Sequence, residues 1–199
     1  MVIETSLRDS ILDAAESLFE RYGYGKTTVD EIAKEAGIGK GSIYLHFESK
    51  EDLAFAWVDR IHRRLEEQLR TILDGDGSFG ARLHKCLVHR VIFRYDLFAC
   101  HERSMDEALI ALKIKLLGRR DAMHRLEAEL IAGHLAAGVA NGECRSLDVQ
   151  KSASSMVTAT NALMPYSLRP NQIGNRQEVV ERTNDLADLL VLAVTKEPR

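Results

Sequence analysis

Apolar residues recur at intervals of three or four along nearly the whole chain, and this spacing constrains the fold more than any other feature. Residues three or four apart share one face of an α-helix, and such a face packs against a hydrophobic core. The chain has only 3 prolines among its 199 residues, and its turn-forming clusters lie far apart. Because proline and closely spaced turns interrupt helices, the pattern predicts an all-α fold.

Glycine clusters and capping residues divide this pattern into segments. The first helix is expected at 5–22, with an apolar face that ends at Tyr22. The glycine-rich stretch at 74–80 is the best candidate for a domain boundary. We therefore expect an N-terminal helical domain at 1–50, a connector helix at 49–73 and a C-terminal helical domain at 74–199. Further helices are expected at 80–99, 104–118, 121–141, 148–164 and 177–195.

Composition limits the location and the cofactors of the protein. Its N-terminus carries acidic residues where a signal peptide needs a basic region and an apolar run. No stretch approaches the roughly 18 apolar residues of a membrane span. The three cysteines are odd in number and share no spacing typical of zinc sites. We therefore expect a cytoplasmic protein that does not contact a membrane and holds no metal or cofactor.

The charge balance excludes a generally basic surface for nucleic acid. The whole chain has a net charge of −3, and the first fifty residues alone hold four Lys and two Arg against three Asp and six Glu. Any contact with DNA must therefore come from a locally oriented patch of side chains.

Residues 28–47 have the spacing of a helix-turn-helix. Thr28 and Glu31 form a capping box at the start of a short helix. Ala33 is small where two helices would cross, and Gly37 allows the tight turn that follows it. Ile43, six residues later, is then the buried anchor of the second helix.

That second helix lies in GIGKGSIYLHFESKEDL, which is a poor helix by propensity. A recognition helix in the major groove needs small or hydrogen-bonding residues on its outer face, so the same residues suit DNA. Gly39 and Gly41 would allow a close approach of the backbone. The hydrogen-bonding side chains are Lys40, Ser42, Tyr44 and His46, with Lys50 at the start of the next helix as an anion site.

The segment GKTTVDEIAKEAGIGKGSIYLHFESKEDL resembles the signature of TetR-type transcriptional regulators, and the resemblance covers about residues 6–60. It implies a homodimeric repressor with an N-terminal DNA-binding domain and a C-terminal ligand-binding and dimerisation domain. The DNA contacts that it implies are Thr28, Lys40, Gly41, Ser42, Tyr44, His46 and Lys50. The scaffold residues that it implies are Ala33, Gly37, Ile43 and Phe47.

The segment at 80–99 is apolar nearly all round, yet it contains His89, Arg90 and Arg94. Polar and charged groups are costly in a buried helix unless they have partners. One interpretation is an effector pocket formed by His89, Arg90, Phe93 and Arg94, for a ligand with an anionic or hydrogen-bonding group. The alternatives are internal salt bridges to acids such as Glu102, Asp106 or Glu107, or exposure near the helix ends.

Two further patterns have structural explanations beside functional ones. Cys86 and His89 are three residues apart, a spacing that two metal ligands on one helix can have. No second pair completes a metal site, so a structural role for the cysteine is favoured. A redox switch would need an exposed thiol with a low pKa. The apolar stripes at 148–164 and 177–195 fit a core as well as a dimer interface, and the resemblance favours the interface.

The sequence therefore predicts a dimer that binds a pseudo-palindromic operator and is released by an unknown small-molecule effector. An enzyme of the helical-bundle kind is the first alternative, but the chain lacks paired Glu-x-x-His sets, His-Glu-x-x-His and a glycine-rich phosphate loop. The second alternative is a small-molecule-binding or structural dimer that keeps the fold without regulating transcription.

Overall fold

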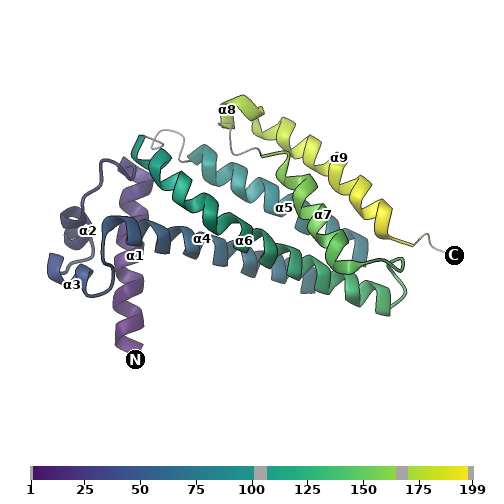
Figure 1. The fold of residues 1–199 in the computed structure, drawn as a ribbon, viewed down its shortest axis with the longest axis horizontal. Coiled ribbons are helices and arrows are strands. Elements are labelled where there is room, and N and C mark those ends of the chain that lie inside the picture. The colour runs from purple at the N-terminus through teal and green to yellow at the C-terminus, as the bar shows by residue number, and fades with distance from the viewer. Residues whose placement is uncertain (1, 101–106, 165–169, 197–199) are drawn as a thin grey trace. The chain divides into compact units, whose positions relative to one another are not determined.

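The computed structural model describes residues 2–100, 107–164 and 170–196 (Figure 1). These residues are mostly helical, and no β-strand occurs among them, so the predicted all-α fold is confirmed. The helices are α1 (Val2–Tyr22), α2 (Val29–Glu35), α3 (Lys40–Tyr44), α4 (Lys50–Asp74), α5 (Phe79–Cys100), α6 (Glu107–Ala140), α7 (Val149–Asn161), α8 (Pro170–Ile173) and α9 (Arg176–Val194).

The chain divides into two compact units. The first comprises Met1–Arg63 with Cys100–Arg119, and the second comprises Arg64–Ala99 with Arg120–Arg199. Helices α4 and α6 each contribute residues to both units. The division within α4 falls between residues 63 and 64, whereas the functional domains 1–50 and 74–199 stay a prediction.

The first unit packs α1, α2 and α3 around one side of α4. Phe19 lies at its centre, with its ring centroid 5.4 Å from that of Trp57 and 5.6 Å from that of Tyr24. Tyr22, expected on the apolar face of α1, is 49% exposed because α1 ends there and the chain turns away at Gly23. The other buried residues of this core include Ile11, Leu12, Ala15, Leu18, Ile32, Leu53 and Ala54.

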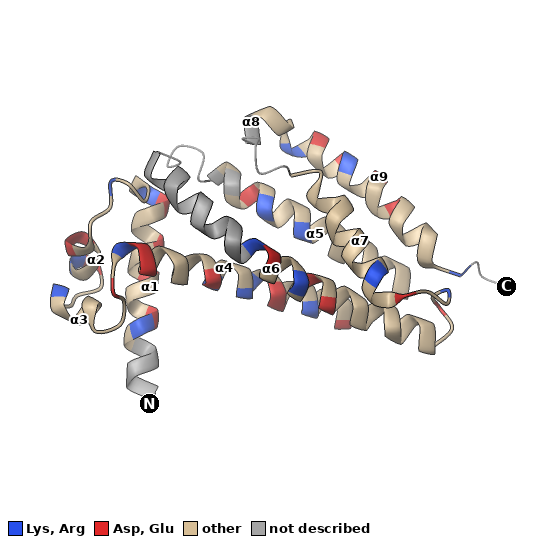
Figure 2. Cartoon of the chain, in the orientation of Figure 1, with Lys and Arg blue, Asp and Glu red and all other residues tan. Residues whose placement is uncertain are grey.

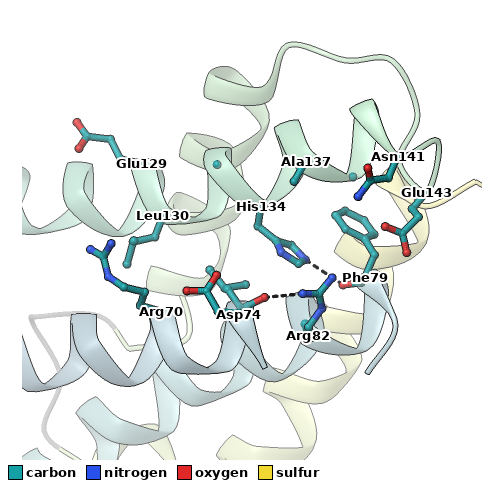
Figure 3. A pocket seen from close by; sticks show the side chains of 13 residues that line it. Arg70, Asp74, Phe79, Arg82, Glu129, Leu130, His134, Ala137, Asn141 and Glu143 are labelled. Atoms are coloured by element: carbon teal, nitrogen blue, oxygen red, sulfur yellow. Dashed lines mark hydrogen bonds between the residues drawn. The ribbon is translucent and has the colours of Figure 1, made fainter. Parts of the chain in front are cut away.

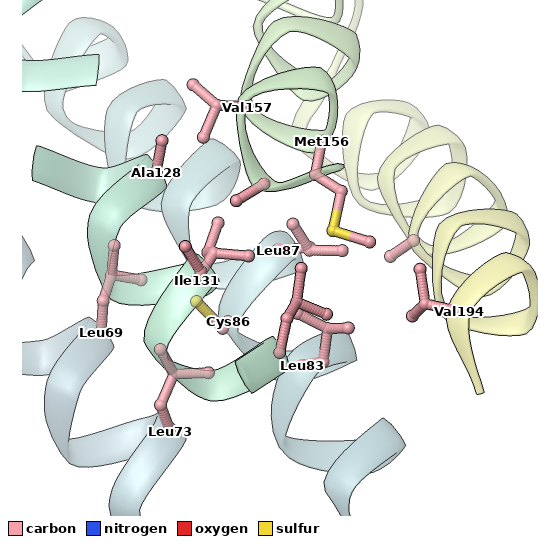
Figure 4. Close-up of a cluster of buried hydrophobic side chains, with 14 of the residues drawn as sticks. Leu69, Leu73, Leu83, Cys86, Leu87, Ala128, Ile131, Met156, Val157 and Val194 are labelled. Atoms are coloured by element: carbon pink, nitrogen blue, oxygen red, sulfur yellow. The ribbon is translucent and has the colours of Figure 1, made fainter. Parts of the chain in front are cut away.

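The second unit has a core of aliphatic side chains from α4, α5, α6, α7 and α9 (Figure 4). Leu83 and Leu87 on α5 are fully buried against Leu69 of α4 and Ile131 of α6. Helix α5 is therefore central to this unit, as its apolar composition predicted.

Two elements differ from the sequence prediction. Helix α6 continues through Gly118, so the predicted break between 104–118 and 121–141 is wrong. A single glycine costs about 1 kcal/mol within a helix, and its neighbours are strong helix formers that tolerate this cost. The predicted loop around Pro170 contains the short helix α8, which starts at that proline because proline suits the first turn of a helix.

Candidate nucleic-acid interface and effector site

Helix α2 begins with the predicted capping box. The hydroxyl of Thr28 accepts a hydrogen bond from the Glu31 backbone N–H at 3.2 Å, and the Glu31 carboxylate accepts one from the Thr28 N–H at 2.7 Å. These bonds to Thr28 hold the pKa of Glu31 below its usual value. Thr28 is exposed, so the start of α2 is fixed while its first polar side chain faces solvent.

The turn after α2 has the predicted scaffold. Gly37 adopts a φ of +68°, which favours glycine, and the N–H of Ile38 donates to the carbonyl of Ala33 at 2.9 Å. Ile43 and Phe47 are each 1% exposed, and Ala33 is also buried. The four predicted scaffold residues therefore have the positions that a helix-turn-helix requires.

Helix α3 buries one side chain and presents the rest. Tyr44 is 48% exposed and Leu45 is 84% exposed, whereas Ile43 is buried. A side chain added at Gly39 or Gly41 would meet no atom within 4 Å, so the backbone there is open.

Leu45, the C-terminal cap residue of α3, was not among the predicted DNA contacts. A helix turns about 100° per residue, so two residues apart lie on opposite sides. That geometry is the signal in the sequence that separates Leu45 from the buried anchor.

The two lysines predicted to contact DNA both have partners within the first unit. Lys40 Nζ lies 2.6 Å from Asp30 Oδ2, and this exposed ion pair raises the pKa of Lys40. Lys50 Nζ donates to the carbonyls of Tyr24 at 2.7 Å and Thr27 at 2.8 Å, and lies 4.3 Å from the Tyr24 ring centroid. Lys50 thus ties the start of α4 to the loop before α2, and its contact with DNA stays a prediction.

Of the remaining predicted contacts, Gly41 and Ser42 lie on α3 and His46 lies in the turn that follows it. Gly41 is exposed, and Ser42 and His46 are partly exposed. The backbone N–H groups of Ser42 and His46 donate to the carbonyls of Gly39 and Ile43, which fixes the turn of backbone that carries both side chains.

Three acidic residues of the first unit lie close to basic side chains of the same unit. Asp13 lies 2.5 Å from Arg60, Glu16 lies 3.8 Å from the same guanidinium, and Asp30 binds Lys40. Helix α3 itself has no acidic residue and begins with the basic Lys40 (Figure 2). The net negative charge of the first fifty residues therefore does not lie on the recognition helix.

The predicted effector residues of α5 lie in two different environments. Arg90 is 0% exposed: its Nε lies 2.8 Å and its Nη2 2.7 Å from Glu127 of α6, and it donates further bonds to Thr160 and Asn161 of α7. Arg94 binds the same Glu127 carboxylate and, at 3.3 Å, the Asn161 side-chain oxygen. We call the set Arg90, Arg94, His124, Glu127, Thr160 and Asn161 the Arg90–Glu127 cluster.

Glu127 was not among the acids that the sequence suggested as partners. Glu102 and Asp106 lie outside the described residues, as does the side chain of Glu107. Although burial opposes its ionisation, Arg94 and Arg90 hold the pKa of Glu127 below its usual value. Glu127 is therefore ionised at neutral pH and bridges α5 and α6.

The other predicted residues of the effector site lie nearer the surface. His89 Nε2 is 2.8 Å from the side-chain oxygen of Gln68, and its ring centroid is 6.0 Å from that of Phe93. Burial lowers the pKa of His89. Both side chains are partly exposed, unlike Arg90, so α5 does not bring all four predicted residues together.

A cavity of about 360 Å³ lies elsewhere in the second unit, between the end of α4, the start of α5 and the end of α6 (Figure 3). His134 stacks on Phe79 with ring centroids 4.6 Å apart, and its Nε2 lies 3.1 Å from the Phe79 carbonyl oxygen. A side chain at Gly138 would collide with the same ring at 2.3 Å. None of the four predicted effector residues lines this cavity.

The cysteines and histidines give no metal or redox site in the part of the chain that the structure describes. No group of three or more potential ligands occurs there. Burial raises the pKa of the Cys86 thiol to about 12, and it also raises that of Cys144. Neither thiol meets the requirement for a redox switch, and the side chain of Cys100 lies outside the described residues.

No helix among the described residues is long and apolar enough to cross a bilayer.

Comparison with known proteins matches residues 11–57 to the family described as bacterial regulatory proteins, tetR family. The A-factor receptor protein of Streptomyces griseus is 40% identical over 79 residues, which are 37% of this chain and 29% of that protein. The transcriptional regulator YhgD of Bacillus subtilis is 24% identical over 157 residues, 77% of this chain and 80% of that protein.

Solved structures extend the likeness to the whole chain. A TetR/AcrR-family regulator from Thermobifida fusca is 27% identical, with a TM-score of 0.64 over 92% of this chain and 96% of that one. The fold of SmeT, solved as a complex with triclosan, has a TM-score of 0.63 at 23% identity over 96% of this chain and 95% of that one. An N-terminal helix-turn-helix and a C-terminal helical region are common to these regulators, so residues 11–57 match the N-terminal domain of the tetR family and the chain as a whole is similar to TetR-type DNA-binding transcriptional regulators.

Proposed function

We propose that this chain is a homodimeric repressor that binds a pseudo-palindromic operator and leaves it when a small molecule binds its C-terminal region. The observation that carries the proposal is the outer face of α3, where Tyr44 and Leu45 are exposed beside two open glycines. Small, aromatic and hydrogen-bonding residues on the outer face of a helix can contact the base edges in the major groove.

In this proposal the side chains of α3 have distinct roles. Tyr44 donates to a phosphate and lays its ring against a base edge, while Leu45 contacts a thymine methyl group. Lys40 exchanges its ion pair with Asp30 for a phosphate, since an exposed pair contributes only about 0–1 kcal/mol. Thr28, Gly41, Ser42, His46 and Lys50 complete the proposed contact surface.

The proposed dimer forms through 148–164 and 177–195. Leu189 and Leu192 of α9 are 65% and 64% exposed in the single chain, and three residues apart they share one helix face. Helix α9 packs on α7, so two copies of this pair would make a four-helix interface. The two helix-turn-helix regions of such a dimer would then reach successive major grooves about 34 Å apart. Sedimentation equilibrium of the full chain tests the dimer.

The proposed effector site lies in the C-terminal region, at Arg90 and Arg94 of α5, while His89 and Phe93, which were predicted beside them, lie nearer the surface. The complex of the related fold SmeT with triclosan supports a small-molecule ligand for a chain of this architecture. An effector causes release from DNA only if it binds the dimer arrangement that does not fit the operator more tightly than the arrangement that does. A DNA-binding regulator of this kind would act in the cytoplasm.

An electrophoretic shift with the DNA upstream of the protein's own gene tests the proposal, with Tyr44→Ala compared with Tyr22→Ala. The two tyrosines have nearly equal exposure, 48% and 49%, but only Tyr44 lies on α3. We expect Tyr44→Ala to weaken specific binding by about 1–3 kcal/mol and Tyr22→Ala to leave it nearly unchanged. Binding of the natural chain that depends on salt but not on DNA sequence would contradict the proposed operator.

A further inference from the structure

The Arg90–Glu127 cluster contains more positive than negative charge in a buried place. Two guanidinium groups, Arg90 and Arg94, share the single carboxylate of Glu127. The side chains of Arg90, Arg94 and Glu127 are 0%, 11% and 6% exposed. A buried charge is costly unless it is paired, and among the described residues the cluster has an excess of one positive charge.

The two arginines differ in how far their hydrogen-bonding groups are used. Arg90 donates from all three guanidinium nitrogens, to Glu127, to Thr160 and the Val157 carbonyl, and to Asn161. Arg94 donates from its two terminal nitrogens, once each, to Asn161 and Glu127. A guanidinium has five N–H donors, so Arg94 keeps donors, including Nε–H, that have no partner among the described residues.

His124 adds a neutral donor beside these groups. It lies one turn before Glu127 on α6, and its ring nitrogens lie 3.2 and 3.3 Å from the side-chain nitrogen of Asn161. Burial, and then the charge of Arg94, lower its pKa to about 4. A neutral imidazole has one acceptor and one N–H donor, so a ring that accepts from Asn161 still has a proton to donate.

We propose that Arg94 and His124 anchor the carboxylate of an organic monocarboxylic acid, which is the effector of this regulator. The proposal rests on the proposed function, in which the C-terminal region binds a small molecule. A single carboxylate supplies the one negative charge that the cluster lacks, and the planar fork of Arg94 fits its two oxygens.

The surroundings of the cluster favour an acid with an apolar body over a bare inorganic anion. Val91 and Tyr95 flank Arg94 on α5, and Met164 follows Asn161 at the end of α7; all three are buried in one apolar cluster. Ala128 and Val157, which lie near Glu127 and Thr160 along the chain, belong to the main hydrophobic core of the second unit. An apolar group attached to the carboxylate would therefore be removed from water as the charge is paired.

The same cluster connects three helices. Glu127 and His124 belong to α6, Arg90 and Arg94 to α5, and Asn161 to α7. An acid that takes donors of Arg94 competes with Glu127 and Asn161 for that guanidinium, which changes the bonds between these helices. Helix α6 contributes residues to both compact units, so such a change has a covalent route to the first unit.

Isothermal titration calorimetry on the full chain tests this inference with matched acids and amides. The probes are octanoate and octanamide, benzoate and benzamide, and inorganic phosphate. We expect at least one acid to bind roughly tenfold or more tightly than its amide, because only the acid pairs with Arg94. Phosphate, which has no apolar body, is expected to bind more weakly than that acid.

The variant Arg94→Gln is compared with Arg125→Gln, which removes the same charge from an exposed arginine of α6 that bonds only to its own helix. Arg94→Gln should weaken binding of the acid by roughly tenfold to a hundredfold, and Arg125→Gln should not change it measurably. Circular dichroism checks that each variant is folded. The acid–amide comparison on the natural chain stands even if Arg94→Gln does not fold.

Three results would overturn the inference: no binding by either acid, equal binding of acid and amide, or natural affinity in a folded Arg94→Gln chain. Tightest binding of phosphate would assign the cluster to inorganic anions and would equally reject an organic acid. The shift assay without any acid reports on operator binding alone. A chain that binds its operator but no acid contradicts only this inference, and a chain that binds acid but no operator contradicts only the proposed function.

Discussion

Helices α3 and α5 both carry polar residues, and these residues lie in opposite environments. Helix α3 buries only Ile43 and turns its polar groups and Leu45 to solvent, where a partner from outside can meet them. Helix α5 is surrounded by core, and its arginines are bound to Glu127 and Asn161 from neighbouring helices. A polar residue on a helix therefore indicates a binding surface only after its partners inside the fold are known.

The largest expected effect on stability comes from a substitution that removes the carboxylate partner of the α5 arginines. Glu127→Gln leaves two buried guanidinium groups without a carboxylate, so we expect the free energy of unfolding to fall by about 3–5 kcal/mol. Glu129→Gln, on an exposed position of the same helix, is the control and should change it little. Urea denaturation of both variants measures the difference. Equal stability of the two would mean that the pair contributes nothing.

The second prediction separates the two aliphatic residues of the recognition helix. Ile43→Ala creates a cavity under α3 and should destabilise the first unit by about 2–5 kcal/mol. Leu45→Ala removes an exposed side chain and should leave stability unchanged while weakening operator binding. Hydrogen exchange of the α2–α3 amides measures local stability. Similar losses of protection in the two variants would show that Leu45 also packs in the core.

The third prediction concerns pH and the cluster. The pKa of His124 falls from an ordinary 6.5 to about 4 in the folded chain, so between these values the unfolded chain binds more protons. Stability from this ring is fully present above pH 6.5 and is lost as the pH falls towards 4. Because the ring is only half-buried, we discount the effect to on the order of 1 kcal/mol.

Thermal denaturation of the natural chain and His124→Asn at pH 7 and pH 5 measures this contribution. The natural chain should lose more stability than the variant over that interval. His84→Asn, which removes a histidine paired to Asp188 at the surface, is the control. The assignment fails if His84→Asn and His124→Asn flatten the pH dependence equally.

The smallest expected effect sharpens the description of α3. Asp30→Asn removes the carboxylate that holds Lys40, so the lysine becomes available to a phosphate. Operator affinity should then rise slightly, with a steeper dependence on salt. Fluorescence anisotropy at several salt concentrations measures both quantities. Glu35→Gln, at the exposed end of α2, removes the same charge without touching Lys40 and controls for net charge.

Local signals in the sequence predicted the first unit well. The capping box at Thr28 and the turn at Gly37 depend on residues three or four apart, so the sequence alone contains the interacting groups. Leu45 was not predicted as a contact because only small or hydrogen-bonding residues were expected on the outer face of the recognition helix, although helical geometry puts it opposite the buried Ile43.

The second unit was harder to predict, because its key contacts join distant residues. Arg90 and Glu127 are 37 positions apart, and nothing near either residue marks the other as its partner. The break expected at Gly118 was wrong for a related reason: glycine weakens a helix locally, but the flanking helix formers decide whether it continues. Partner choice and helix continuity both depend on more of the chain than a local motif contains.

The contacts of the first half of α4 with α1 determine where a chimeric regulator could be joined. If the DNA-binding region of another regulator replaced residues 1–50, Trp57 would lose its contact with Phe19 and Arg60 would lose its ion pair with Asp13. One member of each pair lies before residue 50 and the other lies after it. A junction after Arg63 keeps these partners on one side of the seam. The exchangeable DNA-reading module of this protein therefore includes the first half of α4, and a graft that respects it should carry operator specificity into a regulator with a different effector.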